Sequence, residues 1–145
     1  MLKNENHAMV HEDELEPAGV SRDDGWREMD IRFFDAALSG SENATMFKTV
    51  FAPGAAHERH YHPNADEFLY VISGRAGVGA EDEEYAAEAG SIQFIPAGKV
   101  HWLRNLDENE EVHLVGLYIG GKTLEEAGYV YIGEITEEYR KADAG

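Results

Sequence analysis

Four side chains able to ligate a metal lie in two glycine-bounded blocks, and this pattern limits the fold more than any other feature of the chain. The first block, residues 54–74, is GAAHERHYHPNADEFLYVISG, and the second, residues 90–105, is GSIQFIPAGKVHWLRN. The blocks contain His60, His62 and Glu67, followed much later by His101. Because His101 is distant in sequence, only a fold that returns the chain to the same place can bring all four together.

The spacing within the first block predicts a strand, a turn and a second strand. Successive side chains of a strand point to opposite faces, so His60 and His62 should share one face. Pro63 and Asn64 supply turn chemistry, and Glu67 begins a run of strand-forming residues. Three imidazoles and a carboxylate suit a first-row divalent metal ion. The alternative is a buried pair of hydrogen-bonded histidines and an unrelated surface glutamate.

Both blocks resemble the paired motifs of the cupin family. The first fits Gly, five residues, HxH, four residues, Glu, six residues, Gly, and the second fits Gly, five residues, PxG, two residues, His, three residues, Asn. The resemblance implies a single-domain cupin, an all-β double-stranded β-helix (jelly roll) with short N- and C-terminal helical segments. It also implies one metal ion held by the residues that match the motif, His60, His62, Glu67 and His101. The stretch HPNADEFLYVISG is similar to the metal block of oxalate-decarboxylase-like cupins.

Patterns outside the blocks agree with many short strands separated by turns. Alternation over residues 28–34 predicts a half-buried strand, and residues 45–51 predict a buried strand that ends at Pro53-Gly54. Thr123 and Glu126 have capping-box spacing for a short helix that Gly128 stops. We expect a terminal helix over residues 134–141. The expected organisation is a polar N-terminal extension, a cupin β-barrel domain and a helical tail, at residues 1–25, 26–133 and 134–145.

Charge and composition restrict the partners of this chain of 145 residues. Its formal net charge of −17 argues against nucleic acid, whose phosphates need cationic neutralisation, and against anionic membranes. The absence of cysteine excludes disulfides, thiolate metal sites and cysteine nucleophiles. No apolar stretch has the length of a signal peptide or a membrane span. We therefore expect one cytoplasmic domain whose partner is a small-molecule substrate.

Other candidate residues lie beside the predicted ligands. His57 could act as a general base near neutral pH, and Arg59 or Lys48 could hold an anionic substrate. The alternative is that these are rim or surface residues. His113, which lies in an apolar stretch, is expected to be a hydrogen-bonded core histidine.

Strand alternation also predicts what lies outside the barrel. With Glu67 and His101 facing the interior, Phe68, Tyr70 and Trp102 face outward. We expect these aromatic side chains to pack against another layer or a second subunit. Cupins commonly dimerise through strand faces, so the resemblance implies a homodimer.

The ligand set limits the chemistry without selecting one reaction. Four protein ligands leave up to two positions on an octahedral ion, which a bidentate α-hydroxy acid, hydroxyketone or diketone would fill. Nitrogen and oxygen ligands favour Fe(II) or Mn(II) and also accept Zn(II), Ni(II) or Co(II). We expect a metal-dependent enzyme acting on a small oxygenated organic molecule, with dioxygenase chemistry first and lyase, decarboxylase, isomerase or cyclase chemistry as alternatives. A non-catalytic binding domain and a metal kept for stability alone are the other hypotheses.

Overall fold

A computed structural model describes residues 2–3 and 7–142. Its helices, all of one turn, are η1 (Glu12–Glu14), η2 (Arg22–Asp24), α1 (Ala36–Ser39), α2 (Leu124–Ala127) and η3 (Glu137–Tyr139). Its strands are β1 (Leu2–Lys3), β2 (Ala8–Met9), β3 (Trp26–Phe34), β4 (Ala44–Tyr61), β5 (Asp66–Ser73), β6 (Ala76–Ala80), β7 (Glu83–Ala87), β8 (Ile92–Ile95), β9 (His101–Asn105), β10 (Val112–Ile119) and β11 (Val130–Gly133). None of the described helices is long and apolar enough to cross a membrane.

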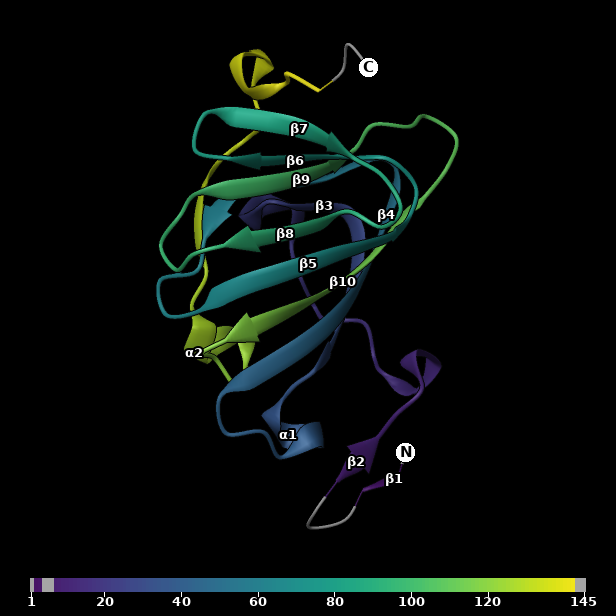
Figure 1. Cartoon of the computed structure of the whole chain (residues 1–145), viewed down its shortest axis with the longest axis vertical. Helices are drawn as coiled ribbons and strands as arrows, with labels where there is room; N and C mark the ends of the chain where they lie inside the picture. Colours follow the sequence, from purple (N-terminus) through teal and green to yellow (C-terminus); the bar gives the residue numbers. More distant parts are fainter. Residues whose placement is uncertain (1, 4–6, 143–145) are drawn as a thin grey trace.

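The main sheet is antiparallel and curls into a half-barrel (Figure 1). Its strands follow the order β7-β6-β9-β4-β10-β5-β8, and β3 and β11 also pair with β4. Within the described residues, the short strands β1 and β2 form a separate pair. These findings confirm the expected all-β jelly-roll fold with short helical segments.

Strand β4 belongs to both halves of the barrel. Its first part, to Phe51, pairs with β10 and β3. From Ala56 onward it pairs with β9 and then β11, while the start of β3 still pairs with Ala56 and His57. The prediction that this strand ends at Pro53-Gly54 was wrong, because it continues to Tyr61. Proline lacks a backbone N–H, and here it lies in the stretch between the two sets of ladder pairs, where none is needed. Gly54 has φ +74°, which a residue without Cβ adopts easily, so the strand turns the corner.

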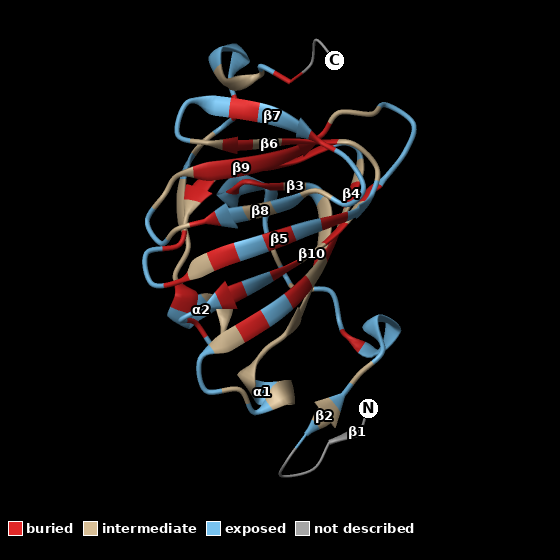
Figure 2. Ribbon diagram, in the orientation of Figure 1, coloured by how far each residue is buried: buried red, intermediate tan, exposed pale blue. Residues whose placement is uncertain are grey.

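Side chains of β5 and β10 alternate between the interior and the surface, as the bands in Figure 2 show. Glu67 and Leu69 face inward, whereas Phe68 and Tyr70 are exposed. Strand β9 instead is buried along its whole length. Trp102 faces outward, as alternation predicts, but it packs with Ala56, Ile135 and Tyr139 of a second cluster, so the C-terminal segment forms the other layer that covers it.

The C-terminal segment contains less helix than the sequence indicated. The helix expected over residues 134–141 is a single 3-10 turn, Glu137–Tyr139. The backbone of the C-terminal segment is held by carboxylates of other strands. The N–H of Ile135 donates to the Glu58 carboxylate at 2.6 Å, and the N–H of Ala142 donates to the Glu84 carboxylate at 2.9 Å. These bonds hold the segment extended against the sheet. The predicted helix α2 is confirmed, with Thr123 as its cap.

Candidate metal centre

Three strands position the four side chains that the sequence predicts as ligands. His60 and His62 lie at and just beyond the end of β4, Glu67 lies at the start of β5, and His101 begins β9. His60 and His101 are paired across the ladder, with ring centroids 4.1 Å apart. The His62 ring lies 5.0 Å from His60 and 5.4 Å from His101. All four residues are at most 4% exposed, so the fold brings them together in its interior.

Backbone carbonyls determine which nitrogen of each imidazole faces the centre. The Nδ1 atoms of His60, His62 and His101 lie 2.6, 2.7 and 2.9 Å from backbone carbonyl oxygens. The oxygens belong to Glu58, Gly128 and Lys99, respectively. Because a carbonyl only accepts hydrogen bonds, each Nδ1 carries a proton, and Nε2 is the nitrogen that faces the centre and is available to a metal. Metal-binding histidines are commonly oriented in this way.

The inward-facing atoms form a cluster of acceptors. The three histidines each offer one nitrogen, and these atoms lie within 4.8 Å of one another. Oε1 of Glu67 lies 3.2 Å from Nε2 of both His62 and His101. Among the described residues, Glu67 Oε1 and all three Nε2 atoms are buried without a hydrogen-bond partner. Buried acceptors that face one another are unfavourable unless a cation or proton lies between them, so the donor set fits a metal ion.

Electrostatics favour, for His60 and Glu67, the protonation state that a metal ligand requires. Burial lowers the pKa of His60 well below its usual 6.5, and the neighbouring His57, His101 and His62 lower it further. Burial alone would raise the pKa of Glu67, but His101 and His62 outweigh it and hold that pKa far below 4.5. At neutral pH the centre therefore contains a neutral His60 and an ionised Glu67.

His57 lies behind the centre in a stack of rings. Its imidazole lies 3.9 Å from the Trp26 ring and 3.7 Å from the His60 ring, with interplanar angles of 26° and 17°. Its Nε2 lies 3.3 Å from the hydroxyl of Tyr129. Burial, together with the charges of nearby histidines, lowers the pKa of His57 well below 6.5. The stack packs against His60, and a catalytic role of His57 stays a prediction.

Arg59 points toward the C-terminal segment. Its Nε donates to the carbonyl of Glu134 at 3.1 Å, and its guanidinium contacts the hydroxyl and the ring of Tyr139. The expected contact of Arg59 with a substrate stays a prediction, and this side chain would have to exchange these partners to make it.

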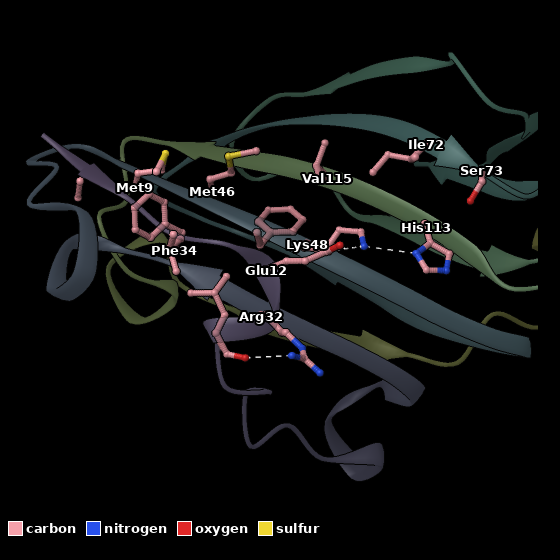
Figure 3. Close-up of a pocket in the computed structure, with 14 residues that line it drawn as sticks. Met9, Glu12, Arg32, Phe34, Met46, Lys48, Ile72, Ser73, His113 and Val115 are labelled. Carbon is pink, nitrogen blue, oxygen red and sulfur yellow. Dashed lines mark hydrogen bonds and ion pairs between the residues drawn. The ribbon is translucent and has the colours of Figure 1, made fainter. Parts of the chain in front are cut away.

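Lys48 and His113 lie in a groove on the outer face of the sheet (Figure 3). The groove has a volume of about 560 Å³ and is lined on one side by N-terminal residues. Nζ of Lys48 donates to Glu12 at 2.7 Å and lies 3.3 Å from Nδ1 of His113. The His113 side chain is 33% exposed, so the expectation of a core histidine was wrong, although it is hydrogen-bonded. Its neighbours on the strand point inward, which explains the apolar sequence around it.

Two interior residues were not identified from the sequence. Tyr118 is 1% exposed, and its ring lies 4.7 Å from the His62 ring. Gln93 is opposite Leu69 in the β5–β8 ladder and lines the same side of the interior. The signal for Gln93 was present, since it is the polar residue within the apolar stretch Ile92–Ile95 and shares the face of Ile95.

Comparison with known proteins agrees with this geometry. The model of the cupin domain family matches residues 47–118. The polyketide synthase CurC of Streptomyces cyaneus is 32% identical over 71 residues, 49% of this chain and 46% of that protein. The oxalate decarboxylase OxdC of Bacillus subtilis is 32% identical over 88 residues, 53% of this chain and 23% of that protein. A crystal structure of a cupin-like protein from Thermotoga maritima matches with a TM-score of 0.72 and 25% identity over 90% of this chain and 96% of that one.

The matched regions contain the candidate metal centre. The chain spans less than half the length of these two curated relatives. The family match nevertheless includes all three buried histidines and Glu67, and the likeness to the Thermotoga maritima structure extends over nearly the whole fold. The chain belongs to the cupin family.

Proposed function

We propose that the protein is a metal-dependent enzyme that acts on a small oxygenated organic molecule. His60, His62, Glu67 and His101 hold one divalent ion, with Fe(II) or Mn(II) favoured by the nitrogen and oxygen donors. The observation that carries this proposal is the convergence of four buried acceptor atoms that have no hydrogen-bond partner. Three of them belong to imidazoles whose other nitrogen is hydrogen-bonded to a backbone carbonyl.

The residues around the centre orient a substrate and exclude water. A bound divalent ion would supply Lewis acidity, and iron would also supply affinity for dioxygen. The adjoining walls are apolar, because Leu69, Ile95 and Leu103 are each at most 3% exposed. In such a partly dry site charge interactions are stronger than in water. A chelating substrate would therefore enter with its two oxygens toward the imidazoles and its carbon skeleton against the aliphatic walls.

Dioxygenase chemistry is the first form of this proposal, because the ligand set and two open positions suit iron and a bidentate substrate. A second form, decarboxylation or another reaction without dioxygen, is favoured by the likeness to the Bacillus subtilis oxalate decarboxylase. Oxygen uptake separates the two forms, measured with the Fe(II)- and Mn(II)-loaded protein on a panel of α-hydroxy acids, diketones and oxalate. Turnover without oxygen uptake would exclude the dioxygenase form. Ligand-induced thermal stabilisation without any turnover would favour a non-catalytic binding domain.

The metal assignment is tested by elemental analysis of two matched variants. His101→Ala removes one buried imidazole from the centre, whereas His113→Ala removes a half-buried imidazole from the outer face. We expect the first to lose bound metal and the second to retain about one ion per chain. Equal metal content in both variants, or a parent protein that takes up no transition metal at neutral pH, would refute the proposal.

We propose that the partner in solution is a second copy of this chain, bound through the outer sheet face. Strands β4, β5, β8 and β10 expose a set of large hydrophobic side chains there, namely Met46, Phe68, Tyr70, Ile72, Ile92, Phe94, Leu117 and Ile119. Phe68 is opposite both Phe94 and Leu117 in the ladders, so the patch is continuous. Contiguous apolar patches of this kind mark interaction sites, and a patch without carboxylates is where two strongly anionic chains can meet.

Light scattering after size-exclusion chromatography tests the homodimer. Phe68→Arg places a charge in the middle of this face and should give a monomer. Tyr85→Arg is the control, because Tyr85 is an exposed aromatic residue of β7, outside this face. A monomeric parent protein, or a dimer that persists in Phe68→Arg, would contradict the proposal.

A further inference from the structure

Gln93 is a partly buried residue one layer away from the candidate ligands. It lies on β8, where Ile95 is opposite Glu67 and Gln93 is opposite Leu69. Residues two apart on a strand share a face and are separated by roughly 7 Å. Gln93 is therefore next to the layer of Glu67 and on the same wall of the barrel.

The side-chain carbonyl of Gln93 is buried without a protein partner. Among the described residues, five buried side-chain polar atoms lack a hydrogen bond, and four of them belong to the candidate metal ligands. The fifth is Oε1 of Gln93. A buried acceptor without a donor costs roughly 1–3 kcal/mol, so its retention needs an explanation, and a ligand that donates to it would provide one.

A small cavity adjoins this amide. Its volume is about 30 Å³, enough for one hydroxyl group or one water molecule. Most of its walls are apolar. The lining residues are Leu69, Val71, Val78, Ala87, Ser91, Ile92, Gln93 and Leu103.

We propose that Gln93 contacts the substrate and selects molecules that carry a hydroxyl or N–H donor beyond their metal-chelating oxygens. The inference rests on the proposed function and narrows its substrate class to chelating carboxylates or ketones with such an additional donor. The chelating end lies at the histidines, and the additional donor lies in the cavity and donates to Gln93 Oε1. A hydrogen-bonding group in an otherwise apolar wall rejects analogues that lack the matching donor, because the buried amide is then left unpaired.

Lactate and glycerate are suitable probes, because they have the same α-hydroxy carboxylate and glycerate adds one hydroxyl. Calorimetric titration of the Mn(II)-loaded protein compares their affinities in the parent, in Gln93→Leu and in Tyr85→Leu. Tyr85 is the control, being 63% exposed on β7 and outside the proposed dimer face. We expect the parent and Tyr85→Leu to bind glycerate roughly tenfold more tightly than lactate, as one hydrogen bond allows. We expect Gln93→Leu to lose this preference.

The outcomes separate this inference from the proposed function. Probes that bind without a preference for glycerate, or a preference that persists in Gln93→Leu, would overturn the role of Gln93 and leave the metal centre standing. Failure to take up Mn(II) or any other transition metal, or equally tight glycerate binding by His101→Ala, would overturn both. A purely structural role would instead lower the melting temperature of metal-free Gln93→Leu while the preference stayed the same.

Discussion

The stack of His57 and His60 predicts that the metal-free protein loses stability below neutral pH. Burial lowers the pKa of both imidazoles well below 6.5, whereas both take up protons near pH 6.5 in the unfolded chain. The unfolded state then binds more protons, so the free energy of unfolding falls as the pH falls. Glu67 acts in the same direction, but only below about pH 4.5, because its folded pKa is also lowered.

The size of this fall in the free energy of unfolding follows from the number of imidazoles that stay neutral in the folded protein. Each imidazole that stays neutral when folded contributes roughly 1.4 kcal/mol per pH unit below 6.5. For His57 and His60 together, the free energy of unfolding should fall by about 2.7 kcal/mol between pH 7.5 and pH 5.5. For a chain of this size the melting temperature should fall by roughly 8–10 °C.

Chelator-treated protein, melted at half-unit pH steps and followed by tryptophan fluorescence, measures this slope. Trp26 stacks on His57 and reports the region directly. The variant His57→Asn separates the contribution of His57 from that of His60. It should remove about half of the pH dependence of stability seen in the parent protein. An unchanged slope in this variant, or a parent whose stability is constant between pH 7.5 and pH 5.5, would refute the reasoning.

Three further predictions concern stability and are checked by thermal or urea unfolding. Removing the metal should lower the stability of the holoprotein by about 4 kcal/mol when the free metal had been at a thousand times its Kd, and an equal melting temperature with and without chelator would contradict this. Glu84→Gln should cost roughly 3–5 kcal/mol, because it takes away the carboxylate that Arg104 contacts at 2.7 and 2.8 Å inside the protein. Gly116→Ala should cost about 1–3 kcal/mol, since a Cβ there would lie 2.7 Å from Leu69 and even closer to the Phe47 ring. Gly19→Ala is the control, because no atom of the described residues lies within 4 Å of a Cβ built there.

The candidate ligands could be predicted because their spacing follows strand geometry. Alternation places His60 and His62 on one face, and the same rule orients Glu67 relative to Phe68. The position of His101 beside the other three ligands could not be predicted from local sequence pattern, because it depends on the pairing of β4 with β9. It was inferred from the resemblance of the two blocks to a known motif pair.

The errors arose where tertiary contacts replace local preference. Pro53 predicts a strand end, but it lies at a corner where no ladder bond uses its N–H. The C-terminal residues favour helix, yet the N–H groups of Ile135 and Ala142 bind carboxylates of other segments. His113 lies among apolar neighbours that face inward, while its own side chain faces outward. In each case the contacts that determine the conformation are made with residues distant in sequence.

The passage of β4 through both halves of the barrel has a consequence for how this chain can vary in length. One strand carries Met46 on the outer apolar face and His60 in the interior. Deleting a single residue between Ala56 and Arg59 would shift the strand pairing by one residue. The side chains of His60 and His62 would then point to the surface, and those of their neighbours would point to the interior. We expect the chain to accept an insertion in an exposed turn such as residues 107–110 more readily than in β4 between Gly54 and His60.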